Sequence, residues 1–303
     1  MLLLLLALGL SLAGRAQTPE RVTRPDGTEV VYYLDRPSAE RYPLAVILQG
    51  SECRRVSDKF ESLVLQLTVA GVAVVRIEKP GLTADTAVGE CPDEYLRLNT
   101  VDRRVLDLLT VLAHLRREEV GWDGRLGLSG GSEGAMVAAM AAPLIPETTA
   151  VLLLSSGGGS EFGEEVKAAI AAQMRASGAD ESQVAEHMAC LEKEWEEIAR
   201  SPLPSQEWAS DGALGRNTYL WWNSALRVAL YRPLAEVRVP IRVYEGSADQ
   251  EMLPGNSQRL QERHQVTGRG NLELVTYEGG HVPPEEVLQD AFRWLGEQLT
   301  RNE

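Results

Sequence analysis

Ser132 lies in the segment Gly130-Gly131-Ser132-Glu133-Gly134, which matches the pattern G-x-S-x-G. In this pattern the chain turns sharply from a strand into a helix, and the turn leaves the serine strained with its hydroxyl exposed. A short apolar run over residues 125–129 precedes the turn, and a run of small residues over 134–142 follows it. This strand–turn–helix setting predicts that Ser132 is a nucleophile.

His281 is the histidine best placed to take a proton from Ser132, since a serine hydroxyl needs a base to become reactive. It follows an apolar run, residues 272–277, in the turn Gly279-Gly280-His281. Ligands and catalytic groups gather at the carboxyl edge of open parallel sheets, where such turns lie. The other histidines fall in segments of helical pattern, where a packing or surface role is the ordinary interpretation: His114, His187 and His264.

A carboxylate is also needed to orient the imidazole. Asp249 is the first acidic residue after the turn at Gly246-Ser247, which follows another apolar run, residues 241–245. We predict Asp249 as the orienting acid and keep Glu251 as the alternative. An aspartate in a loop can equally be solvated or cap a helix.

Apolar runs alternate with segments of helical periodicity along the first half of the chain. The runs cover residues 29–34, 44–49 and 72–77, and helical spacing covers 60–70 between the last two. Asn99 or Thr100 is placed to cap a further helix with one apolar stripe formed by Val101, Val105, Leu109 and Leu112. Continuous apolar runs are typical of strands buried on both faces. The alternation predicts an α/β fold with a mostly parallel, doubly wound sheet.

The second half of the chain interrupts this alternation. After a strand at 150–155, residues from about 160 to 232 are Glu-rich, helical in pattern and rich in tryptophan, with Trp195, Trp208, Trp221 and Trp222. We expect one domain over residues 17–303, with this segment inserted as a helical lid over the carboxyl edge of the sheet. Tyr219, Trp221 and Trp222 could line an acyl or aromatic pocket there, or form the core of the lid itself.

With these elements in place, the chain resembles the α/β-hydrolase superfamily over about residues 29–159 and 238–299. Its GGSEGA elbow and N-terminal β-α unit are similar to the dienelactone-hydrolase and prolyl-oligopeptidase-like branch. The order Ser132, Asp249, His281 is the order of α/β-hydrolase triads. The resemblance implies an oxyanion hole formed by the backbone N–H groups of Glu133 and Ser51. Relatives often carry His-Gly in the second loop, where this chain has Gln49-Gly50.

The three cysteines are too few for a disulfide scaffold, and they include no C-x-x-C spacing of a zinc site. Within the implied fold, Cys53 and Cys91 fall in loops leaving adjacent strands, and Cys53 follows the oxyanion loop. We expect either a disulfide that stiffens this loop or two free thiols. Cys190 lies in a segment of helical pattern, and we expect it to be buried.

The composition and the N-terminal residues indicate the compartment and exclude some partners. The hydrophobic residues make up 44% of the chain and the charged residues 24%, as in soluble globular proteins. A net charge of −14, with no basic run, argues against nucleic-acid binding. Residues 1–13 are almost wholly apolar but too short to span a bilayer. With Gly14-Arg15-Ala16 following, they predict a signal peptide over 1–16 and an exported protein without a membrane anchor.

These features predict a serine hydrolase acting on carboxylic esters or related small acyl compounds, with no requirement for a metal or an organic cofactor. A peptidase or amidase of the same fold is the first alternative, because the triad is shared and only the pocket and the lid would differ. A protein that keeps the fold to bind a ligand without turnover is the second alternative. The sequence does not indicate an oligomeric state.

Overall fold

The sheet at the centre of the molecule has the strand order β1-β2-β4-β3-β5-β6-β9-β10. The computed structural model describes residues 18–83, 86–87, 91–203, 207–209 and 216–301, so the predicted signal peptide lies outside the described residues. The strands of this sheet are β1 (Glu20–Thr23), β2 (Glu29–Asp35), β3 (Tyr42–Leu48), β4 (Ala73–Ile77), β5 (Trp122–Gly131), β6 (Thr148–Leu154), β9 (Ile241–Gly246) and β10 (Leu272–Tyr277).

Strands β4, β3, β5, β6, β9 and β10 run parallel, which places their carboxyl ends at one edge of the sheet. The central strands β3 and β4 are buried along their whole length, as their continuous apolar runs predict. Strands β1 and β2 are antiparallel additions. Strand β1 has no counterpart in the sequence prediction, because its four residues, ERVT, alternate between half-buried and exposed and carry little apolar signal.

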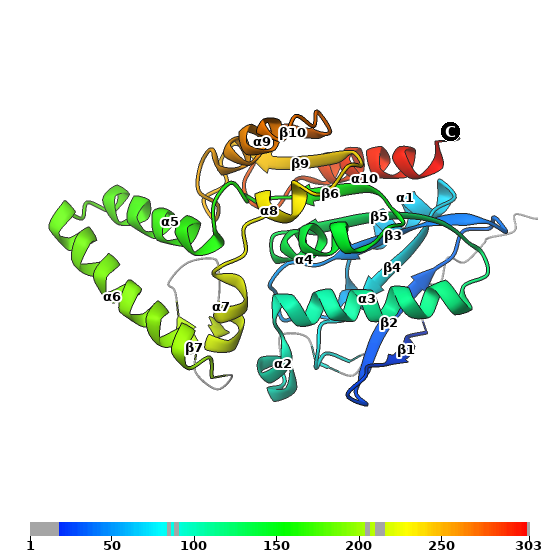
Figure 1. Cartoon of the computed structure of the whole chain (residues 1–303), viewed down its shortest axis with the longest axis horizontal. Helices are drawn as coiled ribbons and strands as arrows, with labels where there is room; N and C mark the ends of the chain where they lie inside the picture. Colours follow the sequence, from blue (N-terminus) through cyan, green and yellow to red (C-terminus); the bar gives the residue numbers. More distant parts are fainter. Residues whose placement is uncertain (1–17, 84–85, 88–90, 204–206, 210–215, 302–303) are drawn as a thin grey trace, which may run out of the picture.

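Helices cover both faces of the sheet (Figure 1), which confirms the predicted doubly wound arrangement. On one face lie α1 (Glu61–Val69) and α10 (Glu285–Thr300). On the other face lie α3 (Val101–Glu118), α4 (Glu133–Ala141), α8 (Tyr231–Leu234) and α9 (Asn256–Val266). Of the two predicted caps for α3, Thr100 is the one used: its side chain accepts a hydrogen bond from the N–H of Arg103. The short helix α2 (Asp93–Leu98) precedes it.

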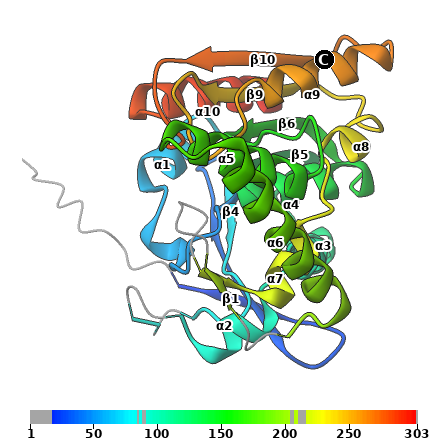
Figure 2. The same cartoon turned by 90° about the vertical axis from the view of Figure 1, so that its left-hand side faces the viewer.

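The segment between β6 and β9 is mainly helical, as predicted, with α5 (Phe162–Ala176), α6 (Glu181–Arg200) and α7 (Tyr219–Ala225). A short antiparallel pair, β7 (Glu207–Ala209) and β8 (Arg216–Thr218), lies between α6 and α7. Asp180 and Gln183 form a capping box that starts α6. Figure 1 shows α5 and α6 extending as a pair beyond the edge of the sheet at which β9 ends, and in the turned view of Figure 2 these two helices lie in front of the sheet.

Cys190 lies in α6 as predicted, but the expectation that it is buried is wrong, because the side chain is exposed. Helix α6 buries a narrow stripe formed by Val184, Leu191 and Ile198. These residues repeat every seven positions, so they share one side of the helix, and Cys190 falls off that side. Helical periodicity alone did not reveal how narrow the buried stripe is.

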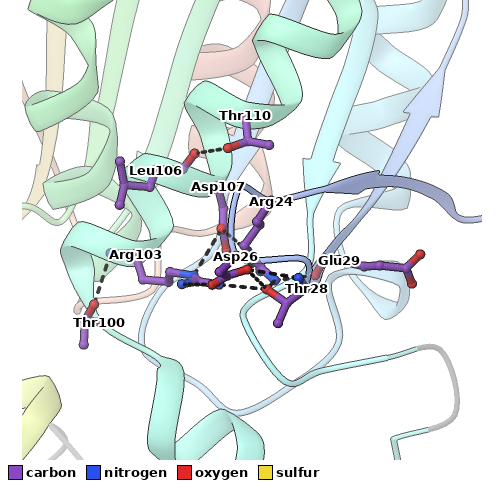
Figure 3. Close-up of polar contacts among 9 residues, drawn as sticks. All are labelled: Arg24, Asp26, Thr28, Glu29, Thr100, Arg103, Leu106, Asp107 and Thr110. Atoms are coloured by element: carbon purple, nitrogen blue, oxygen red, sulfur yellow. Dashed lines mark hydrogen bonds and ion pairs between the residues drawn. The ribbon is translucent and has the colours of Figure 1, made fainter.

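A buried ion pair ties the turn between β1 and β2 to α3 (Figure 3). Nε of Arg24 lies 2.6 Å from Oδ1 of Asp107, and Nη2 lies 2.9 Å from Oδ2, so the guanidinium binds the carboxylate with two parallel bonds. Only 6% and 2% of the two side chains are exposed. Nearer the surface, Arg103 binds Asp26 in the same turn. The antiparallel edge of the sheet is therefore attached to the helix layer by charge as well as by apolar packing.

We predict that Asp107→Ala lowers the free energy of unfolding by about 3–5 kcal/mol, because it leaves the Arg24 guanidinium buried without its counter-charge. Urea unfolding followed by circular dichroism measures the change. Asp26→Ala is the matched control in the same network, and it should hardly change stability because Asp26 is exposed to solvent. Equal losses in the two variants would contradict this interpretation of the buried pair.

Candidate active site

Ser132 occupies the turn between β5 and α4, where the sequence places the nucleophile. Its φ and ψ angles are 53° and −122°, a conformation that residues with a Cβ rarely adopt. The side chain is half-buried, and its Oγ makes no hydrogen bond with any residue that the structure describes. The hydroxyl is therefore held at the end of a rigid strand–turn–helix unit and is free to meet a ligand.

The close packing around this turn explains its two outer glycines. A Cβ at Gly130 would lie 2.1 Å from the carbonyl oxygen of Gly134, and a Cβ at Gly134 would lie 2.1 Å from that of Leu48. Both distances are far below van der Waals contact, so any side chain would force the turn open. The glycines on either side of Ser132 are needed for the backbone to approach itself this closely.

Asp249 and His281 lie together, although 32 positions separate them along the chain. Nδ1 of His281 is 2.9 Å from Oδ2 of Asp249. The other carboxylate oxygen, Oδ1, accepts hydrogen bonds from the backbone N–H groups of Glu251 and Met252, at 2.9 and 3.2 Å. Asp249 is thus held from its own loop while it orients the imidazole, which is the arrangement expected of an acid that sets the tautomer of a base.

The turns after β9 and β10 bring these two side chains together. The N–H of Ser247 donates to the carbonyl of Tyr277, and the N–H of Ala248 donates to that of Gly279, both at 2.9 Å. At Gly246, an added Cβ would lie 2.3 Å from the carbonyl oxygen of Gly280. The two turns are therefore bonded backbone to backbone, and this contact sets the position of Asp249 relative to His281.

The end of β6 connects the nucleophile turn to the histidine turn. The N–H of Ser132 donates to the carbonyl of Leu154 at 2.9 Å. Oγ of the following residue, Ser155, donates to the carbonyl of His281 at 2.5 Å. Ser155 has a φ of 49° and, like Ser132, is in the left-handed region. Two consecutive residues of β6 and its loop thus hold Ser132 and His281 against the same strand end.

The second imidazole nitrogen of His281 faces a carboxylate in this structure. Nε2 lies 3.4 Å from Oε2 of Glu251, the residue that the sequence left as the alternative acid. Burial acts to lower the pKa of His281, but the hydrogen bond and charge of Asp249 and the charge of Glu251 outweigh it, and the pKa is raised. The pKa of Asp249 is lowered: burial opposes this shift, and the bonds from His281 and the two backbone N–H groups produce it.

We predict that Glu251→Gln moves the acid limb of the pH profile of kcat/KM to lower pH. A general base works only when it is unprotonated, so activity rises as the pH passes the pKa of His281. Removing the Glu251 charge removes one cause of the raised pKa, which leaves Asp249 as the remaining acidic neighbour. Glu278→Gln, which alters an exposed carboxylate on the turn that carries His281, is the control and should leave the limb in place. If the acid limb of Glu251→Gln stays at the same pH or moves to higher pH, the prediction is contradicted.

The two segments that carry the backbone groups proposed for the oxyanion hole both lie next to Ser132. Glu133 is the first residue of α4, where an N–H has no partner within the helix. The loop after β3 passes close by, because a Cβ added at Gly50 would lie 3.4 Å from Cβ of Ser132 and 4.0 Å from its Oγ. Ser51 follows directly in that loop. The structure therefore brings both segments to the nucleophile, while their roles remain predictions from the resemblance.

Tyr219, Trp221 and Trp222 lie in α7 and are almost fully buried, with 5%, 2% and 0% of their surface exposed. The two indoles meet edge to face at 4.8 Å, and Phe162 of α5 packs against both. This placement fits the alternative in which these aromatic residues form the core of the inserted segment. Trp221 has a further contact, because its Nε1 donates to the Glu133 carboxylate at 3.1 Å.

Cys53 and Cys91 are joined by a disulfide, which links the loop after β3 to the segment that precedes α2. Across the part of the chain that the structure describes, no group of three or more His, Cys, Asp or Glu side chains is arranged to hold a metal ion. Within the same residues, no helix combines the length and the apolar character needed to cross a bilayer.

Sequence reasoning did not identify several contacts that complete this arrangement. Oγ of Ser155, a residue that the sequence did not single out, holds the backbone of His281. Glu251, kept from the sequence only as the alternative acid, faces Nε2 of His281. A buried cluster formed by Lys79, Arg104 and Glu133 lies behind the nucleophile. A lysine and an arginine inside apolar surroundings give no periodic signal, and only their partners distinguish them from surface charges.

Solved structures with the same architecture include esterases and peptidases. Est1E from Butyrivibrio proteoclasticus, solved with ferulic acid, superimposes with a TM-score of 0.61 at 18% identity, covering 91% of this chain and 98% of that one. The Pyrococcus furiosus esterase Pf2001 superimposes with a TM-score of 0.62 at 16% identity, covering 93% of this chain and 89% of that one. A puromycin-hydrolysing peptidase from Mycobacterium tuberculosis gives 0.64 at 16% identity, covering 94% of this chain and 40% of that one. No protein-family model and no curated protein sequence matches the chain.

At these identities the similarity shows the fold, and the strand order and connectivity agree with it. The chain has the α/β-hydrolase fold, as the sequence resemblance predicted. Among its structural neighbours are the esterases and peptidases of the branch to which its GGSEGA elbow is similar.

Proposed function

We propose that this protein is a serine hydrolase that cleaves carboxylic esters of small molecules through an acyl-enzyme. The hydrogen bond between Asp249 and His281, held at the same strand end as Ser132, is the observation that carries the proposal. In this mechanism His281 takes the proton of Ser132 as Oγ attacks the acyl carbon, then passes it to the leaving group. A water molecule, which gives a proton to His281, then attacks the acyl-enzyme. Ser132 leaves with that proton, and the carboxylic acid is released.

An active-site label and two substrate classes test the proposal. A fluorophosphonate probe should label the folded protein at one site, and peptide mapping should place the label on Ser132. Short p-nitrophenyl esters should be hydrolysed with kcat/KM well above that for aminoacyl p-nitroanilides. Faster turnover of the anilides would favour the peptidase alternative, which is tested because peptidases are among the structural neighbours. A folded protein that neither reacts with the probe nor turns over either substrate would instead be a binding protein.

We further propose that α5, α6 and α7 form the lid of this site and that the mature protein is exported. The inserted helices follow the carboxyl end of β6, and Trp221 reaches the residue next to the nucleophile, which supports a lid. The disulfide between Cys53 and Cys91 suits an oxidising compartment. Cell fractionation with N-terminal sequencing of the mature protein tests export, and a protein that keeps residues 1–16 in the cytosol would refute it.

A further inference from the structure

Three charged side chains are buried behind the nucleophile. Lys79 follows β4, Arg104 lies in α3 and Glu133 follows Ser132, and their side chains are 0%, 4% and 1% exposed. Nη1 of Arg104 lies 2.6 Å from Oε1 of Glu133, and Nζ of Lys79 lies 4.0 Å from Oε2. Charges are costly to bury, and a buried ion pair often adds less stability than apolar residues of the same volume. The burial of these three charges therefore points to a role beyond stability.

The cations of this cluster also bind the loop after β3. Nη2 of Arg104 donates to the carbonyl of Gln49 at 2.7 Å, and Nζ of Lys79 donates to the carbonyl of Glu52 at 2.8 Å. Between these two anchors, the hydroxyl of Tyr95 donates to the carbonyl of Ser51 at 3.2 Å. Three of the four carbonyls from Gln49 to Glu52 are therefore held from inside the protein.

Because the peptide bond is planar, the hydrogen bonds to these carbonyl groups also fix the directions of the neighbouring N–H groups. Each carbonyl shares a plane with the N–H of the next residue, so Arg104 orients the plane between Gln49 and Gly50. Tyr95 orients the plane between Ser51 and Glu52 in the same way. The remaining plane, which carries the N–H of Ser51, lies between these two anchored planes. Its freedom to rotate is limited from both sides.

We propose that Arg104 is a positioning residue for the oxyanion hole. Its guanidinium holds the Gln49 carbonyl with one nitrogen and the Glu133 carboxylate with another, and so sets the spacing between the two backbone donors beside Ser132. The proposal rests on the hydrolase function proposed above. The planar fork of arginine suits this task, because a lysine ammonium is a point charge that cannot span both acceptors in fixed geometry.

The same cluster connects the inserted segment to the nucleophile. Trp221 of α7 donates to Oε2 of Glu133, the carboxylate oxygen that also faces Lys79. Complete burial lowers the pKa of Lys79 to about 7, although the charge of Glu133 acts to raise it. The charge of Arg104 also acts to lower this pKa, so removing Arg104 and Glu133 together removes one influence in each direction. A variant that removes both charges is expected to fold, because the buried Lys79 can still lose its proton near neutral pH.

Two variants and one control test the proposal with p-nitrophenyl acetate as the substrate. The double variant Arg104→Met/Glu133→Gln removes both members of the closer ion pair and leaves Lys79 as the remaining ionisable group of the cluster. Arg104→Lys keeps the charge but loses the fork. We expect kcat to fall about 100-fold in the first and about tenfold in the second, with KM changing by less than about threefold, because misplaced donors weaken transition-state binding alone. Asp107→Asn disrupts an equally buried pair on the same helix and should lower stability while leaving kcat per active site unchanged.

The affinity for an aryl trifluoromethyl ketone is the readout that a purely structural role would not change. His281 takes the hydroxyl proton as Oγ of Ser132 adds to the ketone carbon, the carbonyl oxygen takes the π electron pair, and the resulting oxyanion needs the same two donors. The dissociation constant of the ketone should rise by the same factor by which kcat falls. Values of kcat and ketone affinity within threefold of the unmodified protein, or an equal rise in KM, would overturn the proposal. If the double variant does not fold, Arg104→Lys decides. A protein inert toward esters and fluorophosphonates would overturn the hydrolase function instead.

Discussion

Replacing Ser132 with alanine is expected to lower kcat for ester hydrolysis about 10⁶-fold, as loss of the nucleophile does in serine hydrolases whose residues act as a unit. Alanine keeps the Cβ, so the strained backbone at φ 53° is no worse than before. Oγ of Ser132 also makes no hydrogen bond with the described residues, so the free energy of unfolding should change by less than about 0.5 kcal/mol. Steady-state kinetics at a protein concentration determined from absorbance measures the loss.

Ser129→Ala is the matched control for this variant. Ser129 lies on β5, three residues before Ser132, and its Oγ donates to the carbonyl of Val46 at 2.7 Å. Its loss should reduce stability by about 1 kcal/mol and leave kcat of the folded protein unchanged. If Ser132→Ala retained more than about 1% of the activity, the nucleophile would have to be sought elsewhere.

Asp249→Asn is expected to lower kcat about 10⁴-fold while the fold and KM stay close to those of the unmodified protein. The amide can still accept the backbone bonds from Glu251 and Met252, so the side chain should stay in place. It can also donate to Nδ1 of His281, which favours the tautomer whose proton lies on Nε2, the nitrogen that has to take the proton of Ser132 in the proposed mechanism. A base in that tautomer cannot take a proton from Ser132. The rate of fluorophosphonate labelling should fall together with kcat.

The variant Glu251→Gln separates the two candidate acids. Glu251 lies beside Nε2 of His281, whereas Asp249 bonds to Nδ1, so only Asp249 is placed to set the tautomer. Near the pH optimum, Glu251→Gln should therefore cost far less activity than Asp249→Asn. Equal losses would show that the orienting role is assigned to the wrong carboxylate.

The sequence predicted the fold most reliably where a strand or a helix has a single environment. The buried run of β3 and the apolar stripe of α3 appear in the structure close to their expected bounds. Strand β1 was missed because half of its residues face solvent. The prediction that Cys190 is buried was wrong, because α6 packs along a narrower stripe than its periodicity suggested.

Some features of the candidate site could likewise be predicted from the sequence, and others could not. The types and order of Ser132, Asp249 and His281 could be read along the chain, because each directly follows a strand in a recognisable turn. The contact of His281 with Glu251 could not, because it depends on the side-chain conformations of two loops that meet only in the folded protein. The packing of Trp221 and Trp222 likewise depends on α5 and Glu133, which lie elsewhere along the chain.

The sequence by itself determined the α/β architecture, the elbow at Ser132 and the turns that carry an acid and a histidine. These features are encoded by apolar periodicity and by glycines at short range. Only the tertiary structure decided which carboxylate meets Nδ1 of His281 and how Arg104 joins Gln49 to Glu133. The physical reason is that hydrogen bonds and buried charges act over a few ångströms in space, between residues whose separation along the chain carries no periodic signal.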